Sequence, residues 1–443
     1  MRVSIVGAGY VGLVTGLGLA EIGHDVICVD LDQMRVDQIN AGRPPFYEDG
    51  LDELLATHAG NRLTASTDLT EAVLQTELTI IAVGTPFDGE QIALQQVEGA
   101  SRAIGRALAE KEGYHVVVVK STVVPGTTES VVVPTLEEAS NKRAGRDFGV
   151  GMNPEFLREG NAIADFMEPD RIVLGGIDAR SQDVMAELYK PFTGVEVLRT
   201  TTGTAEMIKY TANSLLATLI SFSNEMANLS ATVGVDAMEV MRGVHLDRRF
   251  TPIAEDGARI WPGSITYLEP GCGFGGSCFP KDVKSLIAFG EQNDSPMRLL
   301  RSVIEINESQ PTKMLELLGR HFSDLSEVPI TVLGMAFKPG TDDIRESPSL
   351  EVTRVLLARG ATVTVFDPVA RKPSEEIFGD QVRYADDLED AIDGSQALLI
   401  MTRWSEFERL PSLLRSDGAQ PLVVDGRRLL DADSVERYEG IGL

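Results

Sequence analysis

Residues 1–12 read MRVSIVGAGYVG, and this stretch decides the fold. Its apolar run is typical of a buried strand and leads directly into Gly7, Gly9 and Gly12. In this G-x-G-x-x-G spacing, glycines permit a tight turn, close approach to a pyrophosphate and close helix packing, while the helix N-terminus supplies positive potential. The alternative is a turn without a ligand, but a strand before the loop and a helix after it favour a dinucleotide site.

An acidic residue at the expected distance strengthens that prediction. Asp30 closes a second strand at 26–30, where its carboxylate can accept hydrogen bonds from a ribose 2′-hydroxyl and repel a 2′-phosphate. The sequence therefore favours NAD over NADP, although Arg35 nearby weakens the preference.

Further apolar strands are expected at 78–84 and 115–122, followed by VGTP (83–86) and KSTVVPGT (120–127). Ligands of open α/β sheets bind at the carboxyl ends of the strands. Ser121 and Thr122 therefore either bind a ligand or cap a helix.

The alternation of strands and helices predicts parallel sheets covered on both faces. Residues 204–234 have helical spacing throughout and predict one long helix that Gly234 stops. Strand candidates return at 329–337, 361–367, 397–402 and 421–426, and GATVTVFD (360–367) echoes GHDVICVD (23–30). We therefore expect an α/β protein with two Rossmann-like, doubly wound parallel-sheet domains joined by a central helical domain, divided as 1–200, 201–320 and 321–443.

The composition points to a globular protein that does not bind nucleic acid. The formal net charge is −27 and the pI is about 4.6, so the surface repels nucleic acid and anionic lipid. This charge either aids solubility or adapts the chain to high salt. Three cysteines, no signal-peptide pattern and no apolar run near about 18 residues predict a cytoplasmic protein without a membrane span.

Residues 271–282 read GCGFGGSCFPKD and place Cys278 between glycines and a helix expected near Pro280. A helix N-terminus and the adjacent Lys281 favour a thiolate, which is the nucleophilic form. Asp282 can accept a proton, hold a water or cap the helix. The alternative is a small buried residue in a turn.

The other cysteines and the histidines suggest no metal site. Only Cys272 lies near Cys278, and no histidine pair flanks them. Cys28 lies inside an apolar strand and is expected in the core. The five histidines are scattered, so a Cys–His catalytic pair is not supported.

Two further segments carry charged candidates. Lys209 and Asn213 are spaced i, i+4 on the long predicted helix and share a face, although a lysine there is commonly just solvated. NPEFLREG (153–160) presents Glu155 and Glu159, where a carboxylate serves as a base or is only a loop charge.

The motifs GAGYVG, NPEFLREG, AEMIKYTAN, GFGGSCFPKD and FKPGTDDIRESP, taken together, resemble the UDP-glucose/GDP-mannose type of nucleotide-sugar dehydrogenase over nearly the whole chain. The resemblance implies oxidation of a sugar C6 alcohol to a carboxylate with two NAD, through a thiohemiacetal and a thioester on Cys278. It also implies a homodimer through the long helix, and glycines that let the cysteine loop approach the sugar.

The same resemblance assigns site residues. The catalytic positions are Cys278, Lys209, Asn213, Asp282, Thr122 and Glu155, with Lys209 and Asn213 stabilising oxyanions. The cofactor positions are Gly7, Gly9, Tyr10, Val11, Gly12, Asp30, Arg35, Thr85, Pro86, Ser121, Thr122, Glu159 and Arg345. The substrate positions are Phe156, Leu157, Lys209, Asn213, Tyr267, Phe274, Gly275 and Lys338, and no metal is expected.

The expected sugar nucleotide is UDP-glucose. GGSC argues against the branch that oxidises N-acetylated hexosamines, whereas GFGGSCFPKD and LREG resemble the enzymes acting on UDP-glucose. Two features instead resemble the enzymes acting on GDP-mannose: the stretch RAGRDFGVGMNPEFLRE and the spacing of SITYLEPG. Arg259 is in doubt as a sugar contact, because the segment RIWPGSITYLEPG departs from the common form of the UDP-glucose enzymes. The remaining alternatives are a GDP-mannose enzyme, a two-electron dehydrogenase with a structural Cys278, and a non-catalytic nucleotide-binding protein.

Overall fold

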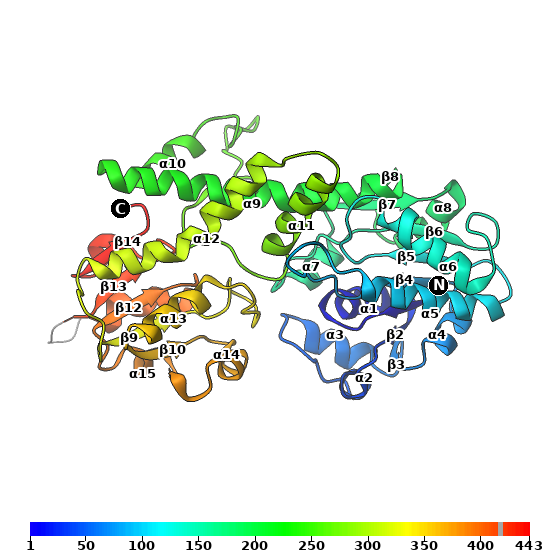
Figure 1. The fold of residues 1–443 in the computed structure, drawn as a ribbon, viewed down its shortest axis with the longest axis horizontal. Helices are drawn as coiled ribbons and strands as arrows, with labels where there is room; N and C mark the ends of the chain where they lie inside the picture. The colour runs from blue at the N-terminus through cyan, green and yellow to red at the C-terminus, as the bar shows by residue number, and fades with distance from the viewer. Residues whose placement is uncertain (415–419) are drawn as a thin grey trace. The chain divides into compact units, whose positions relative to one another are not determined.

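Each half of the chain forms its own α/β unit (Figure 1). The computed structural model describes residues 1–414 and 420–443, which divide into Met1–Ala212 and Asn213–Leu443. The division falls inside helix α9 (Thr202–Val233). This helix confirms the long helix predicted at 204–234. The predicted fold class is confirmed. The helices after α9 belong to the second compact unit, so the three-part division of the chain remains a prediction.

The first unit is built on one eight-stranded sheet with the strand order β3-β2-β1-β4-β5-β6-β7-β8. All neighbouring strands are parallel except β6 and β7. The strands are β1 (Arg2–Val6), β2 (Asp25–Val29), β3 (Leu63–Ser66), β4 (Leu78–Ile81), β5 (Val116–Val119), β6 (Gly149–Met152), β7 (Arg171–Gly176) and β8 (Glu196–Thr200). Because β1 lies between β2 and β4, the glycine loop that follows it emerges where the strand order reverses.

Both faces of this sheet are buried, as a doubly wound fold requires. In β5, Val116 and Val118 enter one hydrophobic cluster, while Val117 and Val119 enter another on the opposite face. Helices cover both faces: α1 (Tyr10–Glu21), α2 (Gln33–Asn40), α3 (Leu51–His58), α4 (Leu69–Gln75), α5 (Gln95–Glu110), α6 (Val133–Ser140), α7 (Ala162–Met167) and α8 (Ala179–Leu188).

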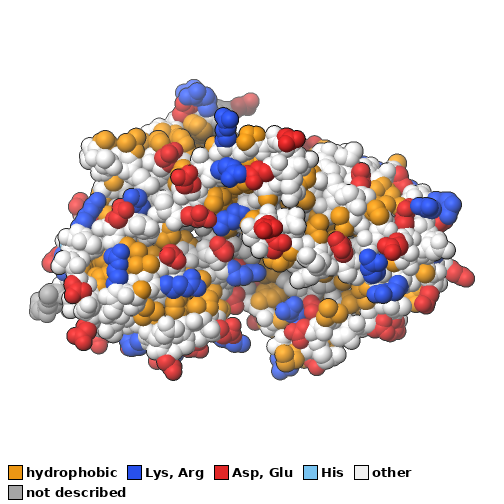
Figure 2. Space-filling view, viewed as in Figure 1, with side chains coloured by type: hydrophobic (Ala, Val, Ile, Leu, Met, Phe, Trp, Pro, Cys, Tyr) orange, Lys and Arg blue, Asp and Glu red, His pale blue; other side chains and the backbone are white. Residues whose placement is uncertain are grey.

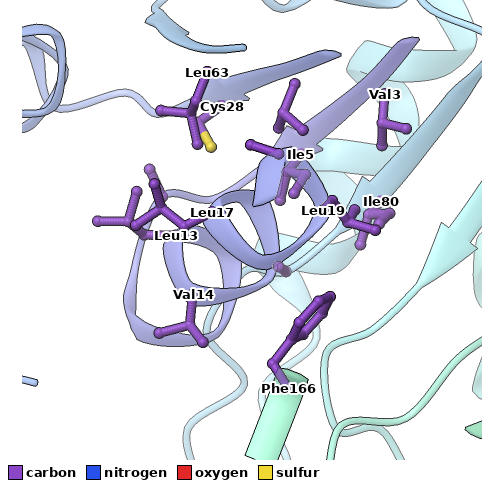
Figure 3. Packing of buried hydrophobic residues seen from close by; sticks show 14 of the residues in the cluster. Val3, Ile5, Leu13, Val14, Leu17, Leu19, Cys28, Leu63, Ile80 and Phe166 are labelled. Atoms are coloured by element: carbon purple, nitrogen blue, oxygen red, sulfur yellow. The ribbon is translucent and has the colours of Figure 1, made fainter. Parts of the chain in front are cut away.

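Helix α1 packs closely in one of these clusters (Figure 3). Leu13, Val14 and Leu17 on α1 are fully buried, as is Ile5 on β1. A Cβ at Gly18 would lie 2.1 Å from the ring of Phe166, so this glycine lets α7 approach α1. Such close packing fixes the start of α1, and therefore the loop in front of it.

The second unit repeats the sheet design with the order β11-β10-β9-β12-β13-β14, all parallel. The strands are β9 (Pro329–Leu333), β10 (Thr362–Phe366), β11 (Arg383–Tyr384), β12 (Ala397–Ile400), β13 (Leu422–Asp425) and β14 (Tyr438–Gly440). Its helices after α9 are α10 (Ala237–His245), α11 (Phe279–Gln292), α12 (Arg298–Gly319), α13 (Pro348–Ala358), α14 (Arg371–Phe378), α15 (Leu388–Ile392) and α16 (Leu410–Leu413). The four strands predicted for this half are confirmed.

The charged side chains are dispersed over the face drawn in Figure 2, where acidic and basic groups are interspersed. In the part of the chain that the structure describes, no helix is long and apolar enough to cross a membrane.

Candidate active site

The first glycine loop is shaped to receive a ligand. Gly7 has φ +98°, and a Cβ there would lie 2.6 Å from the carbonyl oxygen of Ala82. A Cβ at Gly12 would lie 1.8 Å from the carbonyl oxygen of Gly7, so α1 can start here only with glycine. A Cβ at Gly9 would meet nothing within 4 Å, which leaves one side of the loop open. These positions fit a bound pyrophosphate.

Asp30 lies beside this loop, as predicted. Its carboxylate accepts hydrogen bonds from the backbone N–H of Ala8 at 2.8 Å and of Asp32 at 3.0 Å. The guanidinium of Arg35 lies 3.3 Å from the same carboxylate and is the more exposed of the pair. Asp30 therefore both braces the loop and places a negative charge at the end of β2, where a 2′-phosphate would be repelled.

Tyr10 is anchored by a residue that the sequence did not indicate. Its hydroxyl donates to the carboxylate of buried Glu48. The same carboxylate accepts from the backbone N–H groups of Gly160 and Ala162, each at 2.6 Å. Burial, and then the contact with Glu48, raises the pKa of Tyr10. Glu48 thus ties the start of α1 to the segment that contains Glu159.

The loops after β4 and β5 are joined through hydroxyl groups. Thr85, next to Pro86, donates to the backbone carbonyl of Thr122 at 2.7 Å, and Ser121 donates to that of Val83 at 2.7 Å. The sequence left open whether Ser121 caps a helix or binds a ligand. In the structure its hydroxyl donates to a carbonyl just beyond the end of β4, and its part in ligand binding stays a prediction.

A buried ion pair joins two of the candidate catalytic residues of the first unit, Lys209 and Glu155. Lys209 Nζ lies 2.8 Å from Glu155 Oε1, and both side chains are almost completely buried. Glu155 Oε2 accepts from the backbone N–H of Leu157 at 2.7 Å. Burial raises the pKa of Glu155, but attraction to Lys209 and these hydrogen bonds outweigh it and hold the pKa below its usual value. The ring of Phe156 lies beside this pair, 5.6 Å from Lys209 Nζ.

A second lysine completes the buried cluster, although no motif in the sequence pointed to it. Lys120 follows β5, is 4% exposed, and donates to Asn153 Oδ1 at 3.0 Å. Asn153 also accepts from the hydroxyl of Tyr189 and donates to the carbonyl of Val173 at 2.9 Å. A lysine after a strand is commonly a solvated loop charge, so only the tertiary structure shows that this one is buried.

Cys278 lies at the N-terminus of α11, directly before Phe279, with Pro280 in the first turn. Its side chain is partly exposed, whereas Cys28 and Cys272 are buried. Burial raises the thiol pKa of both, to about 12 for Cys28. A buried thiol is inert, so Cys28 and Cys272 are poor nucleophiles. Cys278, by contrast, has the access and the positive helix-end potential that a nucleophile needs.

The glycines of the cysteine loop have a packing role. A Cβ at Gly275 would lie 2.3 Å from the carbonyl oxygen of Glu346, and one at Gly276 would lie 2.7 Å from the Phe337 ring. Gly276 also donates its N–H to the carbonyl of Arg345 at 2.8 Å. The loop is therefore held against residues 337–347 of its own unit, a reason for glycine that the sequence did not reveal.

Asp282 lies one turn into α11 and is 1% exposed. Its carboxylate accepts a hydrogen bond from Asn213 Nδ2 at 2.6 Å and pairs with Lys281. The backbone N–H of Asp282 donates to the carbonyl of Cys278 at 2.8 Å. The structure thus connects three of the residues predicted to be catalytic, since Asn213 is fixed by the residue that follows the cysteine by one helical turn.

The other predicted substrate and cofactor positions of this unit lie near the same loop or in the segment after β9. Phe274 and Tyr267 both pack near Phe279, at ring-centroid distances of 6.0 and 6.2 Å. Arg345 pairs with Asp343 at 2.7 Å, and its side chain is 64% exposed. Lys338 lies 5.8 Å from the ring of Phe337.

These features define a dinucleotide-binding α/β protein with a cysteine nucleophile candidate on a helix N-terminus. Models of one family match along the chain: the NAD-binding domain at residues 1–193, the central domain at 203–309 and the UDP-binding domain at 331–432. The chain belongs to the UDP-glucose/GDP-mannose dehydrogenase family, and it is an NAD-dependent nucleotide-sugar dehydrogenase.

Similar proteins include enzymes for both sugars. A protein named UDP-glucose 6-dehydrogenase AglM, from Haloferax volcanii, is 42% identical over 100% of this chain and 99% of its own. A GDP-mannose 6-dehydrogenase from Azotobacter vinelandii is 42% identical over 83% of this chain and 81% of its own. The solved structure of a UDP-glucose dehydrogenase from Pyrobaculum islandicum has a TM-score of 0.90 and 40% identity, covering 100% of this chain and 97% of that one.

Proposed function

We propose that this chain oxidises C6 of UDP-glucose to the carboxylate of UDP-glucuronate through a thioester on Cys278. The observation that carries the proposal is the partly exposed Cys278 at the N-terminus of α11, in a chain whose other cysteines are buried. Residues 1–200 with their open glycine loop would hold NAD, which when bound would supply the hydride acceptor for two successive oxidations. The UDP group is assigned to residues 321–443, with Lys338 and its positive charge toward the diphosphate.

The carbon chemistry proceeds on the cysteine. After the alcohol has lost a hydride and a proton, the Cys278 thiolate forms a C–S bond with the aldehyde carbon. The alkoxide of this thiohemiacetal collapses to a thioester as the carbon loses its second hydride. A water oxygen then attacks the thioester carbonyl, the C–S bond breaks, and the acid leaves as the thiolate is restored.

Charged and amide groups would serve these steps. Lys209 stabilises the successive oxyanions, because an ammonium in a dry site offsets developing negative charge strongly. Asn213 assists it, while Asp282 and Thr122 position the water. Glu155 is the candidate base for thioester hydrolysis, and its lowered pKa keeps it ionised at neutral pH.

UDP-glucose is preferred to GDP-mannose because the 42% identity to the Haloferax volcanii protein extends over the whole chain. The equal identity to the Azotobacter vinelandii protein extends over 83% of it. The motifs GFGGSCFPKD and LREG support the same choice.

The exposed face of α9 supports a homodimer. Leu215, Phe222 and Leu229 are 58%, 48% and 56% exposed and recur every seven residues, so they form one apolar stripe. A second copy of the same helix is the occupant proposed for this stripe.

The decisive experiment is the yield of NADH per sugar nucleotide, run to completion with UDP-glucose and GDP-mannose separately. Two equivalents from UDP-glucose are expected for the wild type and for the control Cys28→Ala. Cys278→Ser should fail to complete the second oxidation. A wild-type yield of one equivalent, or two equivalents from Cys278→Ser, would assign Cys278 to structure. Two equivalents from GDP-mannose alone would reassign the sugar.

A further inference from the structure

The buried lysine after β5 has no place in the chemistry described above. Lys120 is 4% exposed, and among the residues that the structure describes, the one hydrogen bond of its side chain runs to Asn153 Oδ1. An ammonium has three protons to donate, and its transfer from water to the interior is costly without further compensation. A methionine would fill similar space without that cost. Retention of a lysine here therefore calls for a function.

The groups that face Lys120 are those of the candidate site. Glu155 attracts its ammonium and Lys209 repels it, while burial, the largest influence, lowers the pKa of Lys120 to about 8. The phenol of Tyr189 reaches the cluster through Asn153, whose Oδ1 accepts from both Lys120 and Tyr189. Glu155 thus forms an ion pair with Lys209 and also attracts the Lys120 ammonium.

The charge of this cluster decides what Lys209 can offer to a substrate. Glu155 and Lys209, 2.8 Å apart, are neutral as a pair and present only a dipole to an approaching oxygen. With Lys120 protonated, the same cluster carries one net positive charge. In a poorly solvated site a net charge acts over a longer range than a dipole and is weakly screened.

We propose that Lys120 is a positioning residue for the oxidation, whose buried charge offsets part of the Glu155 carboxylate so that Lys209 keeps a net positive charge for the sugar oxyanion. The inference rests on the proposed role of Lys209. It predicts that kcat depends on a proton that Lys120 carries, and that loss of this proton has little effect on KM.

The test compares kcat and KM of the wild type, Lys120→Met and Lys120→Arg from about pH 6 to about pH 10, a range that spans the expected titration. Lys190→Met, which removes an exposed lysine of the same unit, is the matched control. The wild-type kcat should fall above about pH 8. Below that pH, Lys120→Met should have a kcat about tenfold lower than the wild type. Its kcat should not fall at alkaline pH, because its cluster never carries the net positive charge. Lys120→Arg, which stays charged, should recover activity and shift the fall upward.

A second measurement does not depend on activity. The folded state should release the Lys120 proton at lower pH than the unfolded state, so unfolded chains bind more protons above about pH 8. The thermal midpoint of the wild type should therefore rise relative to that of Lys120→Met as pH increases through this window.

Three outcomes would overturn the proposal: a kcat profile in Lys120→Met equal to that of the wild type, an unchanged alkaline fall in both variants, or a midpoint difference independent of pH. NADH yield separates this inference from the proposed function. A wild type that produces one equivalent per sugar would end the thioester proposal, while the pH comparison would still test Lys120 on the single oxidation.

Discussion

Replacing Lys209 with methionine should destabilise the first unit markedly. Lys209 and Glu155 are both almost completely buried and lie 2.8 Å apart. Removal of one partner of such a pair costs about 3–5 kcal/mol, because a charge is left in the interior without compensation. Lys120 remains as a partial counter-charge for Glu155, so the lower end, about 3 kcal/mol, is expected.

This loss of unfolding free energy converts into a shift of the melting temperature. For a unit of this size, 1 kcal/mol shifts the thermal midpoint by about 2–4 °C, so Lys209→Met should lower it by about 6–12 °C. Circular dichroism at neutral pH measures the shift, with Lys190→Met as the exposed control. A shift below about 2 °C would mean that water reaches the pair and that the desolvation argument is wrong.

The free energy of unfolding should also depend on pH through the shifted pKa of Glu155. The pKa of Glu155 is depressed in the folded state, so its contribution is present above the ordinary glutamate pKa and is lost as pH falls through the folded value. Glu155→Gln should therefore remove part of the acid sensitivity of the wild type. That variant leaves Lys120 and Lys209 buried together without the carboxylate that raises the pKa of Lys120. Lys120 should therefore give up its proton below about pH 8 in Glu155→Gln, and the stability loss of the variant should be smaller at pH 8 than at about pH 6. An equal loss at all pH values would contradict this account.

Three further changes have defined outcomes. Asp30→Ser should raise the NADP to NAD ratio of kcat/KM at least about tenfold, because it removes the charge that repels a 2′-phosphate; an unchanged ratio would place cofactor choice elsewhere. Gly275→Ala should lower the thermal midpoint and disturb the cysteine loop, since its Cβ would lie 2.3 Å from the carbonyl oxygen of Glu346; a fully stable and active variant would show that the loop can move. Phe222→Glu should convert the proposed dimer to monomers in sedimentation experiments, and a dimer that survives would exclude this stripe as the interface.

The strands and the long helix were predictable because their signals are local. A run such as VVVV (116–119) is buried on both faces of a parallel sheet, so it reads as a continuous apolar stretch. The end of α9 was equally clear, since Gly234 adopts φ +75°, a conformation that glycine adopts without strain. By contrast, β8 is largely exposed and β7 runs antiparallel to β6, and neither property has a signature in a short segment.

The candidate site divides in the same way. Gly7, Asp30 and Cys278 lie in motifs whose residue spacing follows from the local geometry, so they could be selected from the sequence. Glu48 and Lys120 were not found, because their importance comes from burial against residues distant in the chain. No local pattern distinguishes such a charge from a solvated one.

Each compact unit is one unbroken stretch of chain, which has a consequence for its synthesis. Domains generally fold as units, N-terminal first, while the ribosome adds about 5–20 residues per second. Once β8 has emerged, the remainder of the chain takes roughly 10–50 s to make at that rate. The glycine loop, Asp30 and the whole first sheet belong to the part that is already complete. We therefore expect a nascent chain that is just long enough for residues 1–212 to have left the ribosome to gain protease resistance when NAD is added, before the half that would hold the sugar nucleotide is complete.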